Sequence, residues 1–250
     1  MLILLIIGCL ILLIFKKIKE NNISFKWRTF VKKGFKIQNG PWGVYCYVGK
    51  QGSGKTFSVI EFLQEHKDYK IYTNLKTLRG VPYKYIGTFE ELLEIENDTD
   101  DNIIIFYDEI FTALTKSTKI NNDVLSFLSQ MRKRKIIFLT TAQDWLEINI
   151  TLRRYVRFQV DCSIKNIFGQ SFLIKVFHDG EQIHWDNLEN DYVSPIIETS
   201  ISKMNKYIAD SYDTYETINS SNKPKVINNS LKPFFLDETS GASKNERSEL

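Results

Sequence analysis

Residues 49–56 read Gly-Lys-Gln-Gly-Ser-Gly-Lys-Thr and fit the pattern G-x-x-x-x-G-K-[ST]. They follow an apolar, β-prone run at 44–48 and precede a segment of helical character at 57–63. A strand, a glycine-rich turn and a helix N-terminus together form a phosphate cradle, because backbone N–H groups converge there and the helix dipole adds positive charge. The alternative is a glycine-rich turn that fits the pattern by chance. The flanking segments favour a nucleoside triphosphate site.

The motif assigns a role to each of its side chains. Lys55 is expected to reach the β- and γ-phosphates, and the Thr56 hydroxyl to ligate Mg²⁺. The predicted cofactors are therefore ATP and Mg²⁺. The predicted nucleotide-binding residues are Gly49, Lys50, Gln51, Gly52, Ser53, Gly54, Lys55, Thr56 and Phe57.

A second motif follows the continuous apolar run at 103–107, which is typical of a central parallel strand. Asp108 and Glu109 come directly after it. Asp108 is predicted to hold the metal, and Glu109 to orient or deprotonate the attacking water, which would make the protein a hydrolase. Acids that merely cap the end of a strand are the alternative.

Polar and basic residues surround the next predicted strand, at 136–140. Gln143 follows that strand and would hydrogen-bond the γ-phosphate or the lytic water; a residue that only caps the following turn is the alternative. Arg132 and Arg134 precede the strand, and Arg153 follows it. Guanidinium groups stabilise transition-state charge when a neighbouring subunit supplies them, and they also bind phosphate backbones.

Strands and helices alternate from residue 43 onward, which predicts an α/β P-loop NTPase with a central, mostly parallel sheet and right-handed crossovers. Further strands are expected at 70–74 and in an antiparallel edge hairpin over 155–177. Helices are expected at 88–94 and 122–134. Residues 75–87 are expected to form a loop or a short edge strand.

The chain begins with an apolar run that ends at Lys16 and Lys17. Residues 1–17 are predicted to be a transmembrane helix, short for a bilayer but extended by snorkelling lysines. A secretory signal peptide would instead carry its basic residues before the run. The positive charge after the run predicts a single-pass protein whose ATPase domain is cytoplasmic.

The remaining segments complete the predicted organisation. Residues 18–42 mix basic and aromatic side chains and are expected to contact anionic lipid or to pack on the ATPase domain. The ATPase domain is assigned to 43–190, and 191–250 to a C-terminal extension that is largely a disordered tail. Within it, 231–236 is a docking peptide or a chance apolar cluster. The three cysteines form no C-x-x-C pair, and the net charge is only +3.

The order of these motifs resembles that of the additional-strand, RecA-like P-loop ATPases of the FtsK/HerA superfamily, which pump DNA. Within that superfamily the chain is most similar to the zonular occludens toxin-like proteins, the assembly ATPases of filamentous phages. The resemblance covers roughly residues 43–162. It depends on GKQGSGKT at 49–56, IIIFYDE at 103–109, QMRKRKIIFLTTAQ at 130–143 and INITLRRYVRF at 148–158.

The resemblance implies roles for several residues. Gln143 would be the sensor glutamine, Arg132 or Arg134 would act in trans or face DNA, and Arg153 would lie in the segment that reports back to the site. It also implies ATP rather than GTP and a homo-oligomeric ring, expected to be a hexamer.

These inferences lead to one functional hypothesis and two rivals. The leading one is a membrane-anchored, Mg²⁺-dependent ATPase that drives DNA export or the assembly of a nucleoprotein virion, with other assembly proteins as partners and a host cell membrane if the protein is viral. The first rival is a DNA-packaging or conjugative DNA-transfer ATPase. The second is a membrane scaffold whose nucleotide state switches assembly.

Overall fold

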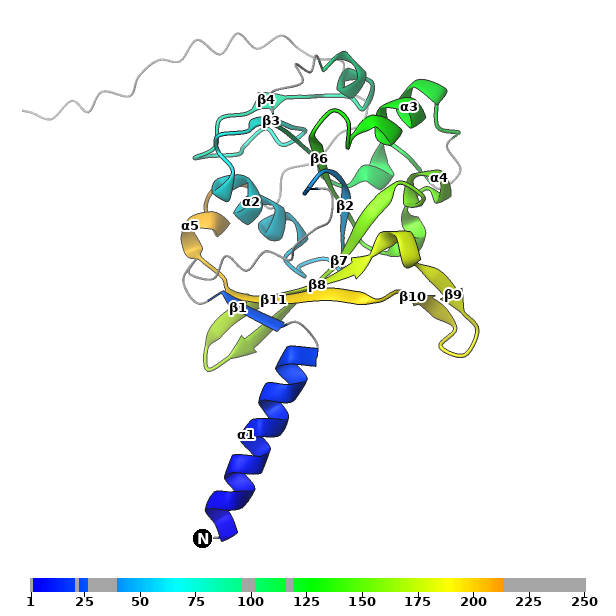
Figure 1. The fold of residues 1–250 in the computed structure, drawn as a ribbon. Helices are drawn as coiled ribbons and strands as arrows, with labels where there is room; N and C mark the ends of the chain where they lie inside the picture. The colour runs from blue at the N-terminus through cyan, green and yellow to red at the C-terminus, as the bar shows by residue number, and fades with distance from the viewer. Residues whose placement is uncertain (1, 21–22, 27–39, 96–101, 116–118, 214–250) are drawn as a thin grey trace, which may run out of the picture.

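The computed structural model describes residues 2–20, 23–26, 40–95, 102–115 and 119–213. Most of the predicted basic segment at 18–42 and the C-terminal tail from residue 214, with its cluster at 231–236, lie outside the described residues. A nine-stranded sheet runs through the molecule, and a separate two-stranded hairpin extends from one side of it (Figure 1).

The strand order of the large sheet is β1-β11-β8-β7-β2-β6-β5-β3-β4. Every neighbouring pair from β7 to β4 is parallel, whereas β8 is antiparallel to both β7 and β11. The strands are β1 (Ile23–Lys26), β2 (Gly43–Val48), β3 (Lys70–Thr73), β4 (Lys84–Tyr85), β5 (Ile103–Tyr107), β6 (Ile136–Ala142), β7 (Val156–Ile167), β8 (Gln170–Asp179) and β11 (Ile196–Lys203), while β9 (His184–Asp186) and β10 (Asp191–Val193) form the small hairpin.

Strand β6 lies between β2, which precedes the glycine-rich loop, and β5, which precedes the acidic pair. This insertion confirms the predicted additional-strand arrangement and the mostly parallel P-loop sheet. Because β2, β6 and β5 are parallel, their carboxyl ends meet at one edge of the sheet. The glycine-rich loop and the acidic pair therefore both lie at that edge.

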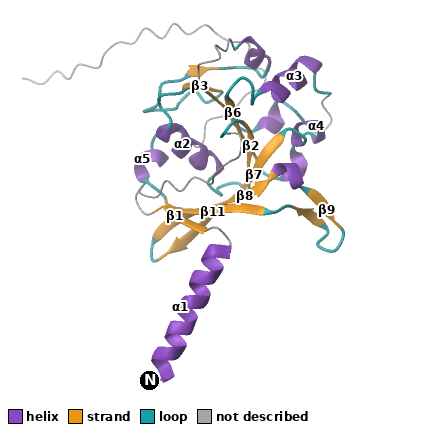
Figure 2. Cartoon of the chain, in the orientation of Figure 1, coloured by secondary structure: helices purple, strands orange, loops and turns teal. Residues whose placement is uncertain are grey.

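Two hydrophobic cores cover the two faces of the sheet, and helices lie on both sides of it (Figure 2). On one face pack α2 (Lys55–Glu65) and α5 (Lys206–Ala209). On the other pack α3 (Asn122–Gln130), α4 (Ile150–Arg153) and the 3₁₀ turns η1 (Glu90–Glu94) and η3 (Trp145–Glu147). Strand β5 is buried on both faces because Ile103, Ile105 and Tyr107 enter one core and Ile104 and Phe106 the other.

Two predicted helices are shorter or tighter than expected. The segment predicted as a helix at 88–94 is the 3₁₀ turn η1. Helix α3 ends at Gln130 rather than near 134, and a turn follows in which Lys135 has a φ of 50°. A left-handed residue cannot continue an α-helix, so this turn redirects the chain into β6.

The hairpin of β7 and β8 forms as predicted but does not lie at the edge of the sheet. Strand β11 pairs with β8, and β1 pairs with β11, so two further strands extend the sheet beyond the hairpin. Residue 190, where the ATPase domain was predicted to end, therefore precedes a strand of the same sheet. The chain also contains η2 (Ile110–Thr112) and η4 (Gly180–Gln182).

Helix α1 (Leu2–Glu20) projects from the side of the molecule where β1 lies (Figure 1). Among the helices of the described residues, none combines the length and apolar character needed to cross a membrane. The transmembrane helix predicted at residues 1–17 is thus not supported.

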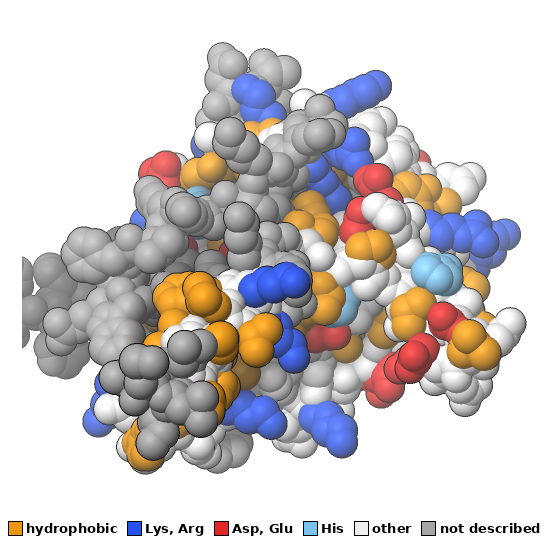
Figure 3. Space-filling model, turned by 60° about the horizontal axis from the view of Figure 1, so that its bottom comes forward, with side chains coloured by type: hydrophobic (Ala, Val, Ile, Leu, Met, Phe, Trp, Pro, Cys, Tyr) orange, Lys and Arg blue, Asp and Glu red, His pale blue; other side chains and the backbone are white. Residues whose placement is uncertain are grey.

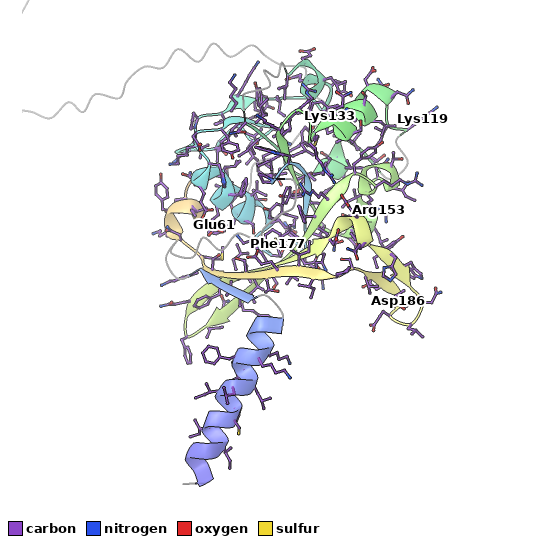
Figure 4. All side chains as sticks on the ribbon, viewed as in Figure 1. Glu61, Lys119, Lys133, Arg153, Phe177 and Asp186 are labelled. Carbon is purple, nitrogen blue, oxygen red and sulfur yellow. The ribbon has the colours of Figure 1, made fainter. Side chains whose placement is uncertain are left out.

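A buried ion pair connects α2 to β8. Lys175 Nζ lies 2.7 Å from Glu61 Oε2, and the two side chains are only 8% and 13% exposed. Glu61 lies on the helix that follows the glycine-rich loop (Figure 4), so the pair fastens that helix to the antiparallel half of the sheet.

Removing one partner of this pair should be costly because the other charge is left buried and unpaired. We expect Glu61→Ala to lower the free energy of unfolding by about 3 kcal/mol. The double variant Glu61→Leu/Lys175→Met should be much closer to the wild type. Urea denaturation followed by tryptophan fluorescence measures both; a double variant as unstable as Glu61→Ala would contradict a burial penalty.

Candidate active site

The glycine-rich loop occupies the turn between β2 and α2. Gly54 precedes the helix with a φ of 88°, and no side chain caps the first turn. The first N–H groups of α2 have no partner inside the helix, so they can bind an anion. A Cβ at residue 54 would also lie 2.8 Å from Leu173 Cδ1, so both backbone conformation and space require glycine there.

The loop also contains an orphaned polar atom. Ser53 Oγ is buried and has no hydrogen-bond partner among the described residues. Buried hydroxyl groups are rarely left without a partner in folded proteins. An acceptor such as a phosphate oxygen would satisfy this group, and it fits the anion site formed by the amides.

The Lys55 side chain folds back over the loop. Its Nζ donates to the carbonyl oxygens of Gly49 at 2.6 Å and Lys50 at 3.1 Å. Burial lowers the pKa of Lys55, and the nearby carboxylates of Asp108 and Glu109 oppose that shift. The ammonium group is therefore held by the loop's own carbonyl oxygens, and the acidic pair is close enough to influence its charge.

Asp108 contacts the start of α2 through Thr56, whose hydroxyl lies 3.3 Å and 3.4 Å from the two carboxylate oxygens. The Thr141 hydroxyl donates a second hydrogen bond to Asp108. Burial raises the pKa of Asp108 to about 6; the hydrogen bonds from Thr141 and Thr56 and the charge of Lys55 oppose this rise, whereas Glu109 adds to it. The structure thus joins the two predicted motifs at one point.

Two positioning residues were not assigned from the sequence, Asn74 and Thr141. The Asn74 side chain accepts from the Asp108 N–H at 2.8 Å and donates to the Asp108 carbonyl at 3.1 Å. Thr141 Oγ accepts from the Glu109 N–H at 2.9 Å. Polar residues at the carboxyl ends of β3 and β6 were the available signal, since both strands flank β5.

Glu109 has a left-handed backbone, with φ 52° and ψ 56°. A non-glycine residue in this region carries strain, and such residues gather at functional sites. The hydrogen bond from its N–H to Thr141 holds this conformation as the chain turns into η2. The carboxylate therefore leaves the sheet beside Asp108 in a fixed backbone orientation.

Gln143 lies at the same edge of the sheet as Asp108. It follows Ala142, which pairs with Val48 and accepts a hydrogen bond from the Gly49 N–H at 3.3 Å. Its side chain is exposed. The backbone position thus places Gln143 beside the start of the loop, between the two motifs.

Arg132 and Arg134 lie at the opposite edge of the sheet, because they precede the amino end of β6. Arg132 pairs with Glu181 at 2.6 Å, both side chains being largely exposed. Arg134 donates to the Ile95 carbonyl at 2.7 Å and stacks on the Phe127 ring. Lys133, between them, marks this region beside α3 (Figure 4). The structure therefore does not bring these arginines to the loop of their own chain.

Arg153 lies in α4, on the side of the β9–β10 hairpin (Figure 4). Its Nε donates to the Ile148 carbonyl at 3.0 Å, and its guanidinium group lies 6.0 Å and 5.7 Å from the ring centroids of Trp145 and Tyr192. It therefore links η3 to the hairpin. Among the described residues, its contacts are thus with η3 and the hairpin and not with the acidic pair.

The donor set of the site suits a magnesium ion. The residues that would hold it are Thr56 and Asp108, a hydroxyl and a carboxylate. Within the described part of the chain, no group of three or more His, Cys, Asp and Glu side chains could hold a metal. Mg²⁺ commonly takes one or two protein oxygens and completes its shell with water and substrate phosphates. The residues present fit that mode, and the ion would neutralise phosphate charge.

Comparison with known proteins gives a family match over the same region. Residues 45–166 match the model described as "ATPase family associated with various cellular activities (AAA)", a span of 122 residues in a chain of 250. This match agrees with the loop geometry and confirms the predicted class, a P-loop ATPase. A search of the curated proteins found no match.

Several solved structures are similar to this chain. One is the N-terminal domain of zonular occludens toxin from Neisseria meningitidis, with 20% identity, a TM-score of 0.44, and 70% of this chain and 100% of that chain covered. A second is the genome packaging NTPase B204 from Sulfolobus turreted icosahedral virus 2 in complex with ATP-gammaS, with 13% identity, a TM-score of 0.44, and coverage of 63% and 100%. A third is the flagellar accessory protein FlaH from Methanocaldococcus jannaschii, with 12% identity, a TM-score of 0.42, and coverage of 65% and 89%.

The buried carboxylate of Asp108 leads to a prediction about stability. Its pKa is raised from 3.8 to about 6, so ionisation penalises the folded state as pH rises from about 4 to 6. Asp108→Asn should therefore increase the free energy of unfolding by roughly 2–3 kcal/mol at pH 8 and by under about 1 kcal/mol at pH 4, and it should abolish Mg²⁺-dependent ATP turnover.

Urea denaturation at the two pH values measures the stability difference, and phosphate release measures turnover. Asp144→Asn is the matched control, since Asp144 is an exposed acid at the same edge whose side chain caps η3. It should change neither quantity appreciably. An Asp108→Asn variant less stable than the wild type at pH 8 would show that the carboxylate contributes stability there.

Proposed function

We propose that this protein is a Mg²⁺-dependent ATPase, attached to a membrane, that drives DNA export or virion assembly at the cytoplasmic face. The observation that carries the enzymatic part is the contact of Thr56 with Asp108, which joins the phosphate loop to the acidic pair. A turn that only resembles a phosphate loop would not require that second motif beside it.

The hydrolytic chemistry follows from the positions of the side chains. Loop amides and Lys55 bind the phosphates, once the lysine releases the Gly49 and Lys50 carbonyls. Glu109 accepts a proton from the attacking water, and Gln143 hydrogen-bonds that water or the γ-phosphate. Asn74 and Thr141 keep Asp108 and Glu109 fixed, so little reorganisation accompanies the reaction.

Membrane attachment is proposed for α1. Eight large apolar side chains between Ile6 and Phe15 are 47% to 69% exposed, so no packing against the domain explains them. Such a helix buries apolar area favourably in a bilayer, and Lys16 and Lys17 follow it on the side of the domain. The positive charge supports placing the domain on the cytoplasmic side, at a host cell membrane if the protein is viral.

A homo-oligomeric ring is proposed from the placement of the arginines. Arg132 and Arg134 are remote from the loop of their own chain, which is the arrangement expected of residues that serve a neighbour. Head-to-tail contacts between copies close into rings. The superfamily that the motifs resemble supplies the expectation of a hexamer, and of DNA or a nucleoprotein virion as cargo.

Two other functions are kept as alternatives. A packaging or conjugative ATPase would use the same site to move DNA inward or between cells. A nucleotide-switched scaffold would bind ATP and assemble on a membrane but turn over slowly. Turnover that increases with DNA separates both motors from the scaffold.

The loop and the acidic pair generate matched predictions. Lys55→Ala should abolish ATP binding or reduce turnover by 10³-fold or more, on the order of the loss of a charge-stabilising group. Glu109→Gln should bind ATP normally and hydrolyse it about 10²–10⁴-fold more slowly, because the general base is lost. Fluorescent-nucleotide binding and phosphate release with purified full-length protein measure both quantities.

Controls separate these effects from misfolding. Lys67→Ala changes an exposed lysine that follows the far end of α2, away from the loop, and it should retain most of the turnover. Wild-type activity in Lys55→Ala would remove the site assignment, and full turnover in Glu109→Gln would assign the base elsewhere. Turnover unchanged by single- and double-stranded DNA, together with nucleotide-dependent oligomerisation, would favour the scaffold.

A further inference from the structure

The sheet beyond β7 has one face that neither hydrophobic core covers. Leu173 points toward α2, since it lies against Gly54, so the residues that alternate with it on β8 point the other way. These are Phe172, Ile174 and Val176, and they pair with Lys203, Ile201 and Thr199 of β11. We call this surface, with Lys165 of β7, the outer face.

The outer face is apolar in its middle and basic at the end next to the β7–β8 turn. Phe172, Ile174, Val176 and Ile201 are partly exposed, and neither core of the described residues includes them. Lys165 and Lys203 lie on either side of Phe172 and are exposed. Asp161 of β7 pairs with Val176 at the other end of this face, where its carboxylate lies 3.1 Å from His178 Nε2, and Lys175 points to the opposite face, where it pairs with Glu61. Next to the β7–β8 turn, the surface therefore combines apolar area with positive charge.

The turn between β7 and β8 adds the most exposed aromatic side chain of the described residues. Phe168 is 99% exposed and has a φ of 50°, and its neighbour Ile167 is 49% exposed. A left-handed turn holds the Phe168 side chain away from the sheet. Two adjacent large apolar side chains gain no free energy from exposure to water at a hairpin tip. Contact with an apolar phase would bury them and therefore accounts for them better than solvation does.

The outer face and α1 share one side of the molecule. Helix α2 covers the opposite face of β8 and β11, and α1 projects from the uncovered side, with the β7–β8 turn on that side as well (Figure 1). Viewed from there, apolar side chains lie among lysine and arginine side chains (Figure 3). A bilayer that receives α1 would therefore also meet the outer face.

We propose that the outer face and the Ile167–Phe168 tip are a second membrane-binding surface, specific for anionic lipid, which rests on the membrane attachment proposed for α1. The apolar tip inserts into the headgroup region, and Lys165 and Lys203 bind the lipid phosphates. Two contacts fix the orientation of the domain on the membrane, whereas α1 alone would leave it free to tilt.

A site-specific fluorophore tests this surface in the full-length chain. Cys9→Ser removes the exposed cysteine, and Cys46 and Cys162 are buried, so a cysteine introduced by Phe168→Cys is labelled selectively with a polarity-sensitive dye. On vesicles containing phosphatidylserine, its emission should shift to the blue and be quenched by lipid-borne quenchers. Pure phosphatidylcholine vesicles should give neither change.

The matched control is Leu188→Cys at the tip of the β9–β10 hairpin, since Leu188 is 97% exposed and apolar but lies on another element. Its dye should stay in water. In the Phe168→Cys chain, adding Lys165→Gln and Lys203→Gln should lower the lipid-inserted fraction roughly tenfold or more, since each basic residue near an anionic surface strengthens binding severalfold.

The outcomes separate the two proposals. Vesicle flotation of the chain with the residue 168 dye still in water would overturn the second surface and leave attachment through α1 standing. No flotation on any vesicle would overturn both. A blue shift that appears without vesicles and grows with protein concentration would show that the outer face binds a second copy of the chain instead, and would overturn lipid as its occupant.

Discussion

The parallel pairing of β2, β6 and β5 is the constraint on which the rest of this structure depends. It brings the carboxyl ends of three strands to one edge, and each strand then delivers one part of the site. Had β6 been placed elsewhere, Thr141 could not bond both Asp108 and Glu109, and Gln143 would not lie beside Gly49. The strand order therefore determines which side chains can meet at the site.

Hydrogen bonds, several of them to backbone groups, hold the described residues of the site together. Asn74 bonds both the N–H and the carbonyl of Asp108, as a neighbouring strand would, just where β3 and β5 end. A carboxylate buried this deeply costs free energy when ionised, and the Thr141 and Thr56 hydroxyl groups offset only part of that cost. The proposed binding of Mg²⁺ by Asp108 would account for the presence of this unfavourable group.

The central strands and the loop could be predicted because their signals are local. β2, β5 and β6 are continuous apolar runs, and the glycines of the loop follow one of them directly. The strands beyond β7 could not be predicted in the same way. Strand β11 buries Glu198, Ser200 and Ser202, so its polar residues point inward and its periodicity suggests a solvated segment. Pairing between β11 and β8 overrides that pattern.

The sequence also could not show which side chains become partners across the sheet. Asn74 appears only as the last residue of a predicted strand, and nothing local shows that Asp108 lies beside it, 34 residues later. For the arginines, the residue type was misleading. It suggests phosphate binding, yet Arg153 packs on Trp145 and Tyr192. A basic residue takes its role from its position in the sheet topology, which distant pairing decides.

The close approach of Leu173 and Ile164 to Gly54 has a mechanical consequence. These two side chains belong to β8 and β7, and they touch the loop at the residue where the helix starts. Ile164 and Leu173 pair with each other three residues from the turn between β7 and β8. A side chain added at residue 54 would therefore have to displace the outer part of this hairpin as well as the loop.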